Sequence, residues 1–477
     1  MNKLVDKYLS MSIELKAGFW FLFCNLVQKG IQFITVPIFT RLLTTEQYGQ
    51  YTLFQSWYSI ISIFATLNLS AGVFNNGMVK YEDRRDQYVS SMQGLTTCIS
   101  MLLFIPLISI VILMGISNKY PYPVIILMFI EFMTYTAFTF WSVRCRFEYL
   151  YRKLVIITVG FLLISTIISL LWVFYANNKG IARIESVLIC NIVIGIVFYI
   201  YNFCKGKCFY NKEFWRFALK FNLPLIPHYL SMVFLNQIDR IIISYMCNEK
   251  QVAIYSLANS ISLIINVVIT SINSAYIPWI YGMLKEKQEI DYNKIKNISN
   301  YIFLAVCCLT LIPMIFGPEI MAIMGPSEYQ EGAGLIIPLS LSTLFIFLYS
   351  VLLGNVEFYF EKSTYTLIAS SISAVLNIIT NYIFIAKFGY FAAAYTTLLC
   401  YIVMALLHYY FNLKICKKEN IKFIYSVKSI TLMIIAVVLL SLIIALNYNY
   451  KLIRYSILIL LLCSGMIIYK KSRKIFK

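Results

Sequence analysis

Long apolar runs recur along the whole chain and are separated by short polar segments. Each run is about twenty residues long, roughly the length that an α-helix needs to cross a ~30 Å hydrocarbon layer. The strands of a membrane barrel would instead alternate over about ten residues. The pattern therefore predicts an all-α polytopic membrane protein with about 14 transmembrane helices. We expect these helices at residues 18–40, 51–73, 92–115, 121–143, 154–175, 181–203, 219–246, 252–281, 298–324, 334–356, 364–386, 390–413, 427–447 and 452–470.

The composition agrees with a chain that has the bilayer as its solvent. Of the 477 residues, 60% are hydrophobic and 13% are charged, which is more apolar surface than one soluble core could bury. The segment 1–16 lacks a short apolar core followed by a cleavage site, so we expect no removable signal peptide. The 12 cysteines form no CxxC motif with partner histidines, and no ATP-binding loop is present. We therefore expect no zinc site, no disulfide framework and no cofactor.

The positive charge is concentrated on one side of the predicted topology. The net charge is +19, and with a cytoplasmic N-terminus the cytoplasmic segments hold 30 of the 40 Lys and Arg residues. The outer segments hold 8. This bias predicts a multi-pass protein of the bacterial inner (cytoplasmic) membrane with both termini in the cytoplasm. It also explains the basic charge without a nucleic-acid partner.

The chain contains an internal repeat. Tyr51-Thr52-Leu53 recurs as Tyr255-Ser256-Leu257 at a spacing of 204, and the segment 147–153 recurs as 356–362 at a spacing of 209. Six predicted helices separate the copies, so both copies should cross the membrane in the same direction. We expect an N-terminal six-helix lobe at 1–216 and a C-terminal six-helix lobe at 217–424. Two appended helices and a basic cytoplasmic tail would occupy 425–477.

Several short motifs resemble a known family. They are Arg41-Leu42-Leu43 with Glu46 to Tyr51, Gln237 to Arg240, Pro278-Trp279, Gly325 to Tyr329, Lys362 to Thr364, Asn377 with Asn381, and Phe388-Gly389-Tyr390. In this order and spacing they resemble the polysaccharide and O-antigen flippases of the multidrug/oligosaccharidyl-lipid/polysaccharide exporter superfamily. The chain departs from the usual Gly-x-x-Gly-Ala pattern of the second lobe, because it reads Gly389-Tyr390-Phe391-Ala392-Ala393.

The resemblance implies a transporter that moves undecaprenyl-diphosphate-linked oligosaccharide repeat units, the precursors of O-antigen or capsule, across the inner membrane. Two lobes of this kind are expected to work by alternating access. Besides this lipid-linked substrate and the bilayer, a polysaccharide polymerase and chain-length proteins are the expected partners, and the transport unit is expected to be a monomer.

Ionisable side chains inside the predicted helices are candidate site residues, because each costs roughly 2.5 to 3.5 kcal/mol to insert. Lys29, Arg240 and Arg41 would form a cationic cleft for the pyrophosphate, since both cation types bind phosphate. The polar lining of this cleft is expected to comprise Gln28, Asn236, Asp239, Asn377 and Asn381.

Each of these residues also has a purely structural alternative. Lys29 could contact a carbonyl or Glu131, and Arg41 could anchor the helix at the interface. Asp239 and Arg240 could form a salt bridge that locks the lobes. Asn377 and Asn381, on one helix face, could bridge helices.

Glu131, Asp239 and His228 are candidates for ion coupling. Burial favours the neutral form of a carboxyl group, so Glu131 could take up and release a proton. His228 follows Pro224 and Pro227, which should break or bend the entrance of helix 219–246 and could form a gating hinge. His408, near an inner helix end, is expected only to pack.

Other functions fit the sequence less well than transport. A membrane polysaccharide polymerase would need a large outer loop with catalytic residues, whereas the outer connections here are on the order of a dozen residues or fewer, so the chain is not expected to be an enzyme. A channel would need polar rings from several protomers. A lipid II flippase or a multidrug antiporter of the same superfamily stays open. The antiporters typically have twelve helices and acidic cavities, which fits this chain less well.

Overall fold

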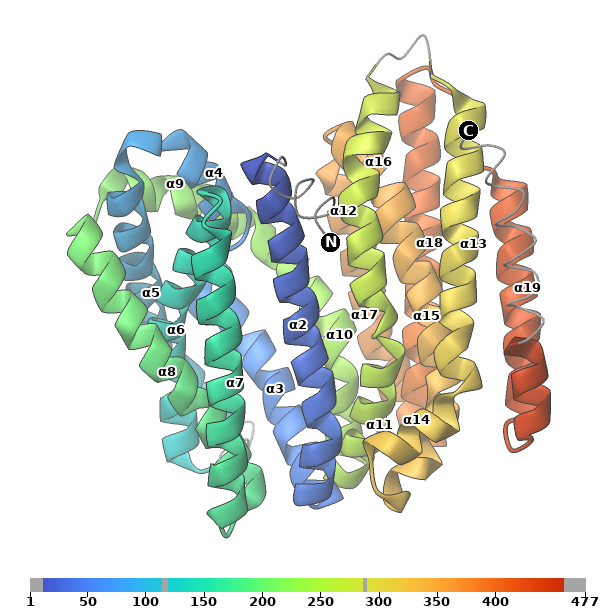
Figure 1. Cartoon of the computed structure of the whole chain (residues 1–477), viewed down its shortest axis with the longest axis horizontal. Helices are drawn as coiled ribbons and strands as arrows, with labels where there is room; N and C mark the ends of the chain where they lie inside the picture. The colour runs from blue at the N-terminus through green and yellow to red at the C-terminus, as the bar shows by residue number, and fades with distance from the viewer. Residues whose placement is uncertain (1–11, 114–118, 286–289, 459–477) are drawn as a thin grey trace, which may run out of the picture. The chain divides into compact units, whose positions relative to one another are not determined.

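The computed structural model describes residues 12–113, 119–285 and 290–458, and every regular element in these ranges is a helix (Figure 1). The predicted all-α class is therefore confirmed. Eleven helical stretches of the described chain are long and apolar enough to cross a membrane, as expected for a polytopic membrane protein. Two less apolar helices, Thr45–Thr66 and Ile226–Met246, coincide with two further predicted spans.

Some sequence predictions concern residues 1–11, 114–118, 286–289 and 459–477, which lie outside the described residues. They include the start of the N-terminal segment, the basic tail and most of the last predicted helix, 452–470. The helical residues 451–458 match the beginning of that helix.

The chain divides into two compact units, Met1–Ile241 and Ile242–Lys477. We refer to them as unit 1 and unit 2. The units reflect which helices pack together, whereas the lobes 1–216 and 217–424 were inferred from duplicated segments. The lobe boundaries and the appended pair at 425–477 therefore stay predictions.

Unit 1 consists of helices that run mostly antiparallel to their neighbours in sequence (Figure 1). They are α2 (Ile13–Leu42), α3 (Thr45–Thr66), α4 (Gly72–Lys80), α5 (Arg85–Leu113), α6 (Tyr122–Phe147), α7 (Tyr151–Tyr175), α8 (Lys179–Gly206), α9 (Lys212–Asn222) and α10 (Ile226–Met246), whose residues up to Ile241 belong to this unit.

Local sequence explains where several of these helices begin. Thr44 and Gln47 form a reciprocal capping box at the start of α3. The Asn178 side chain accepts a hydrogen bond from the backbone N–H of Ile181 and so caps α8. α3 ends at Thr66, earlier than the predicted end at residue 73, because Leu67 and the next residue adopt left-handed backbone angles.

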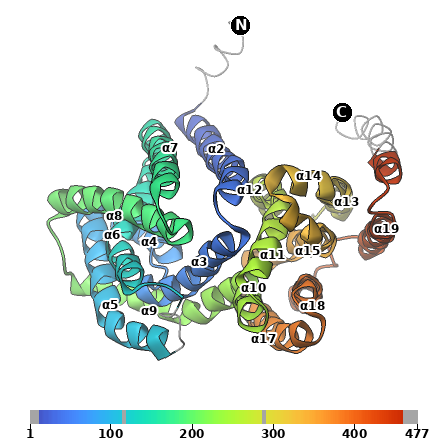
Figure 2. The ribbon, with the colours of Figure 1, turned by 90° about the horizontal axis from the view of Figure 1, so that it is seen from below.

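The core of unit 1 lies where α3, α6 and α8 meet, and α6 packs closely along α8 (Figure 2). Gly195 makes this close approach possible. A Cβ atom at this position would lie 2.6 Å from the backbone carbon of Thr134 on α6. Any larger residue would therefore have to push the two helices apart.

The predicted break at the entrance of helix 219–246 is confirmed. α9 ends at Asn222, a 3-10 turn covers Leu223–Leu225, and α10 starts at Ile226. Pro224 lies in the turn, where its missing N–H removes a helical hydrogen bond. The buried Asn222 side chain donates a hydrogen bond to the carbonyl of Leu67, which ties this break to the end of α3.

Unit 2 is also built of helices, several of them short. They are α11 (Glu249–Ser262), α12 (Ile265–Leu284), α13 (Tyr292–Ile315), α14 (Gly317–Met324), α15 (Ile336–Phe347), α16 (Gly354–Tyr359), α17 (Ser363–Phe388), α18 (Phe391–Lys418) and α19 (Val427–Leu446), with a 3-10 helix at Ser327–Leu335 and a π-helix at Leu348–Leu353. α19 packs against α13 (Figure 2).

Three predicted spans of unit 2 are interrupted. The predicted helix 298–324 is α13 followed by α14, because Pro318 has no N–H to donate to the carbonyl of Met314 and so interrupts the helical hydrogen bonds near Phe316. The predicted helix 334–356 contains the π-helix, and the predicted helix 252–281 breaks between α11 and α12. Hydropathy alone does not reveal the last two interruptions, because Glu249–Leu284 and Ser327–Tyr359 are each apolar enough on average to count as one span.

Candidate functional site

Unit 1 contains a cavity of about 420 Å³ whose wall is half polar. Helices α2, α3, α6, α7 and α8 contribute to it. Its polar and aromatic lining residues are Gln32, Thr35, Phe39, Tyr48, Tyr51, Gln55, Tyr135, Phe161, Ser165, Thr166, Arg183 and Asn191. A cavity with amides, hydroxyls, aromatic rings and one cation is suited to a polar or anionic ligand.

Arg183 supplies the positive charge of this cavity. It lies in the first turns of α8, and its guanidinium carbon is 3.8 Å from the ring centroid of Phe39 and 5.1 Å from that of Tyr51. Its Nη1 donates a hydrogen bond to Ser169, while its buried Nε has no hydrogen-bond partner among the described residues. The part of the chain that the structure describes places no carboxylate in an ion pair with Arg183, so its charge is available to a ligand.

Glu131 lies directly behind the wall of the cavity. Its side chain is fully buried on α6 and accepts hydrogen bonds from the Tyr58 hydroxyl at 2.7 Å and from Asn191 Nδ2 at 3.1 Å. Asn191 also lines the cavity, so one amide connects the carboxyl group to the cavity space. These contacts give Glu131 partners other than Lys29, the partner considered from sequence.

The predicted cations of α2 lie on its exposed surface. Lys29 is exposed and forms no hydrogen bond or ion pair with another described residue. It lies three residues before Gln32 of the cavity wall. Gln28 donates a hydrogen bond to Cys24 Sγ at 3.2 Å, and Arg41 donates one to the Pro37 carbonyl at 3.0 Å.

The predicted polar residues of α10 form a small network with α3. Arg240 Nη1 donates to the Asn236 carbonyl at 2.7 Å and to Gln237 Oε1 at 3.0 Å. Ser56 on α3 donates to the same Gln237 oxygen at 3.0 Å. Asp239 is buried, whereas the Asn236 side chain is exposed and donates to the carbonyl of residue 232, one turn earlier in α10. Two of the acceptors of Arg240 thus lie on its own helix.

The remaining predicted residues are not gathered around the cavity of unit 1. His228 is half-buried just after the break before α10, with its ring 6.1 Å from that of Tyr229. Asn377 and Asn381 are fully buried on α17 of unit 2. Asn381 accepts a hydrogen bond from Thr396 on α18 at 2.5 Å, which is the helix bridge considered from sequence. Both side-chain atoms of Asn377 are without a hydrogen-bond partner among the described residues.

Arg183 and its aromatic partners were not recognised as site residues from the sequence. Arg183 is an ionisable residue near the start of the predicted helix 181–203. This position inside a predicted helix is the signal by which Arg183 could have been identified. Tyr58 and Asn191 gave no signal of their own, because the contact with Glu131 joins three different helices.

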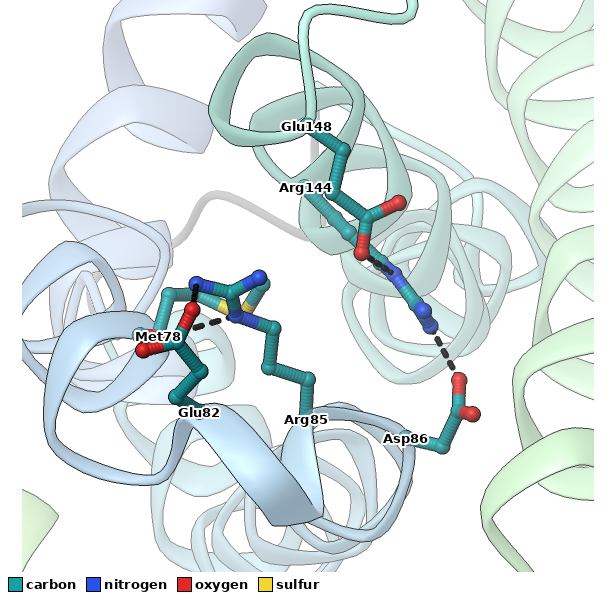
Figure 3. A network of polar contacts seen from close by, with 6 residues as sticks. All are labelled: Met78, Glu82, Arg85, Asp86, Arg144 and Glu148. Carbon is teal, nitrogen blue, oxygen red and sulfur yellow. Dashed lines mark hydrogen bonds and ion pairs between the residues drawn. The ribbon is translucent and has the colours of Figure 1, made fainter.

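Unit 1 also contains a network of ion pairs (Figure 3). Arg144 on α6 pairs with Glu148 at 2.8 Å and with Asp86 at the start of α5. Arg85 pairs with Glu82 at 3.3 Å and donates to the carbonyl of residue 78. These contacts tie α4, α5 and α6 together in the segments that the charge bias places in the cytoplasm.

Two family models and several curated proteins match the chain. The model described as "Polysaccharide biosynthesis protein" matches residues 15–284, and the MatE model matches residues 224–383. Lsg locus putative protein 1 of Haemophilus influenzae is 22% identical over 358 residues, which cover 74% of this chain and 86% of that protein. Capsular polysaccharide biosynthesis protein CapF of Staphylococcus aureus is 23% identical over 398 residues, which cover 82% and 97% of the two chains.

Solved structures share the fold. The lipid II flippase MurJ in an inward closed conformation superposes with a TM-score of 0.68 at 15% identity, over 96% of this chain and 99% of that one. A multidrug resistance MATE transporter in an inward-facing conformation superposes with a TM-score of 0.57 at 14% identity, over 80% and 93% of the two chains. At these identities the similarity establishes the fold alone.

Proposed function

The chain belongs to the polysaccharide biosynthesis protein family, and on this premise we propose that it is a flippase for lipid-linked saccharides. Its substrate would be an undecaprenyl-diphosphate-linked oligosaccharide repeat unit, the precursor of O-antigen or capsule. The protein would move the headgroup across the cytoplasmic membrane by alternating access, as a transporter and not as an enzyme. A polysaccharide polymerase and chain-length proteins would use the product on the outer side.

The observation that carries this proposal is the cationic, half-polar cavity of unit 1. A pyrophosphate needs a cation in a place that excludes bulk water, and the planar guanidinium of Arg183 can bind two phosphate oxygens at once. The sugars need amides and hydroxyls for hydrogen bonds and aromatic faces for stacking. Gln32, Gln55, Tyr48 and Tyr51 provide both kinds of contact.

The other cations are proposed to act before or after binding in this cavity. Lys29 lies on the same helix as Gln32 and is exposed, so it can attract an anionic headgroup toward the cavity. Arg240 and Arg41 are proposed as further phosphate contacts, and Gln28, Asn236 and Asp239 as polar neighbours. For Arg41, the interfacial anchor stays the alternative.

Glu131 is proposed to couple transport to protons. Protonation of this buried carboxyl would change which of its two hydrogen bonds can persist, since a protonated oxygen donates instead of accepting. The change would reach the ligand through Asn191, which lines the cavity. Asp239 and His228 are proposed as further ion-coupling residues. For these two residues the proposal includes no route to the cavity.

A lipid II flippase is the second candidate function. The fold similarity to MurJ covers nearly the whole chain. Lipid II, like the substrate proposed above, joins a sugar headgroup to an anionic lipid carrier. A drug antiporter for cations is less favoured, because Arg183 lines the cavity of unit 1 and none of its described lining residues is Asp or Glu.

The proposal can be tested by complementation. A host that lacks its own O-antigen or capsule flippase would express this chain together with the matching sugar gene cluster, and surface polysaccharide would be measured. We expect polymer to return with the unchanged chain and to be lost with Arg183→Ala at equal membrane levels. Lys205→Ala, a cation of the same helix α8 outside the cavity, is the matched control. Polymer that stays absent with the unchanged chain would refute this substrate class and leave lipid II as the next candidate.

A further inference from the structure

Unit 2 contains a fully buried pair of titratable side chains where α16, α17 and α18 meet. Glu357 on α16 and His408 on α18 have no exposed surface, and His408 Nδ1 lies 2.8 Å from Glu357 Oε1. Thr366 on α17 donates to Glu357 Oε2 at 2.9 Å, and Asn412 on α18 donates to Oε1 at 3.1 Å. His408 was expected only to pack, whereas the structure gives it a carboxyl partner.

The hydrogen bonds indicate how many protons this pair holds. Three donors converge on the carboxyl group of Glu357, so it accepts from all of them when it is ionised and His408 carries a proton on Nδ1. The pair then has a charge of −1. His408 Nε2 is buried without a hydrogen-bond partner among the described residues. One more proton, on Nε2 or on the carboxyl group, brings the charge of the pair to zero.

The equivalent carboxyl group in unit 1 has a permanent cation instead. Glu148 and Glu357 correspond in the internal repeat at a spacing of 209. The Glu148 side chain accepts a hydrogen bond from Arg144 Nε at 2.8 Å (Figure 3). An arginine stays charged at any physiological pH, whereas a histidine changes its charge between about pH 5 and 8. The two repeats thus contain one fixed ion pair and one that can exchange a proton.

The groups that the structure describes around the pair do not supply another charge. The titratable neighbours are Tyr349, whose ring stacks on His408 at 5.5 Å, with Tyr401, Tyr365, Cys416, Tyr425 and Tyr276 on the elements packed around it. Tyrosine and cysteine side chains are neutral at physiological pH in the absence of an activating charge.

The charged side chains closest in sequence lie apart from the pair. Glu361, Lys362 and Lys414 form no hydrogen bond or ion pair with either side chain in the described structure, and Lys414 lies over the ring of Tyr410 instead. Among the described residues, no charged side chain other than Glu357 and His408 thus takes part in this contact.

The pair is connected to the π-helix that precedes α16. Asn412 Nδ2 donates to Glu357 and also to the carbonyl of Leu353, the last residue of the π-helix, at 3.1 Å. Tyr349 of the π-helix stacks on His408. Protonation of Glu357 would turn one of its acceptor sites into a donor, so that a hydrogen bond at that oxygen would have to reverse its direction or change its partner. π-Helices are often found at functional sites, where the helix can rearrange.

We propose that Glu357 and His408 form a proton-binding site, and that proton binding loosens or tightens α16 against α17 and α18. The use of this proton to drive transport rests on the proposed flippase function, whereas its binding does not. The bound species is one proton per chain, taken from solution when the charge of the pair changes from −1 to zero. The fixed Arg144–Glu148 pair of unit 1 stays charged in both states.

Hydrogen–deuterium exchange of the full chain in nanodiscs of phosphatidylethanolamine and phosphatidylglycerol tests the binding. Exchange of peptides that cover residues 348–366 would be measured between pH 5.5 and 8, corrected for the intrinsic pH dependence of exchange. A one-proton linkage changes a local opening equilibrium by up to about tenfold per pH unit. We expect this transition in the unchanged chain, its loss in Glu357→Gln and His408→Asn, and its persistence in Glu148→Gln, the control in the other repeat.

Two results would overturn the proposal: a pH-independent opening of this segment in the unchanged chain, or a transition that survives in Glu357→Gln. The first of these results is measured on the unchanged chain, so the proposal can be refuted even if a variant folds poorly. A flipping assay on the same preparation separates the two claims. If the transition is present and no saccharide lipid is flipped, the proposed function fails while the proton site stands.

Discussion

Arg183 shows how single residues define the cavity of unit 1. Its guanidinium is held between two aromatic rings and a serine, and its Nε faces no protein acceptor in the described chain. Glu131 was identified from the sequence because a carboxyl group inside an apolar run is conspicuous. Its partners Tyr58 and Asn191 could not be found in this way, because sequence periodicity does not report which helices meet.

Replacing Arg183 with lysine should impair transport although the charge is kept. Lysine cannot form two parallel hydrogen bonds to phosphate or stack flat on Phe39. The loss of charge-assisted hydrogen bonds of about 1.5–3 kcal/mol predicts binding that is roughly 10- to 100-fold weaker. Binding of the saccharide lipid to Arg183→Lys and to the control Lys205→Ala would be compared by titration. Equal affinities would show that Arg183 does not contact the headgroup.

Glu319 and Arg454 form an ion pair in unit 2 that should make stability depend on pH. Arg454 is almost fully buried, and its Nη2 lies 2.7 Å from Glu319 Oε1. The hydrogen bond from Arg454 holds the pKa of Glu319 below its usual value. The stabilisation is therefore complete above the unfolded-state pKa, near 4.3, and is lost as the pH falls through the lower folded-state pKa.

Glu319→Gln should therefore lower the free energy of unfolding at pH 7 by about 1–3 kcal/mol, and this decrease should be smaller in acid. Thermal unfolding of the purified chain at pH 7 and pH 4 would measure this. The assignment would be contradicted if the variant lost more stability, relative to the unchanged chain, at pH 4 than at pH 7. Lys250→Gln, from the exposed pair with Glu328, is a control that should change stability by less than about 1 kcal/mol.

At the scale of helices, the sequence predicted positions well and interruptions poorly. The break before α10 was predicted because Pro224 marks it, whereas the break between α11 and α12 and the π-helix Leu348–Leu353 occur in segments whose average hydropathy is that of one membrane span. Hydropathy depends on side chains, and these interruptions are properties of the backbone. The close contact between α6 and α8 was also not predicted from the sequence, because it depends on one glycine, Gly195.

That contact predicts a sharp difference between two glycine substitutions. A Cβ at Gly195 would meet backbone atoms of α6 at 2.6 Å, whereas one at Gly160 on α7 would meet nothing within 4 Å. Gly195→Ala should destabilise the protein by about 1–3 kcal/mol and separate Asn191 from Glu131. Gly160→Ala should unfold at the temperature of the unchanged chain or above it. Equal thermal unfolding of both variants would show that α6 and α8 can part without cost.

At the scale of the whole molecule, the sequence established the class of the protein. The all-helical membrane fold and the resemblance to the polysaccharide flippases were confirmed by the helices, the matching family model and the solved structures. The cavity could not be predicted, because its wall combines five helices. The topology was inferred from charge alone and stays a prediction.

Cysteine labelling with a membrane-impermeant reagent tests the topology. In a background without the other cysteines, exposed Cys204 should react only after the membrane is permeabilised. A cysteine placed at the exposed position Tyr450, in a predicted outer segment, should react in intact cells. The opposite pattern would invert the topology and remove the positive-inside explanation of the net charge.

The most direct test of the central claim is flipping in proteoliposomes. A fluorescent, short-chain polyprenyl-diphosphate oligosaccharide would be placed in one leaflet, and its appearance in the other would be followed with a membrane-impermeant quencher. The account predicts flipping with the unchanged chain and with Lys205→Ala, and at least tenfold slower flipping, as an order of magnitude, with Arg183→Ala. Flipping no faster than in protein-free liposomes, or flipping that Arg183→Ala leaves unchanged, would contradict it.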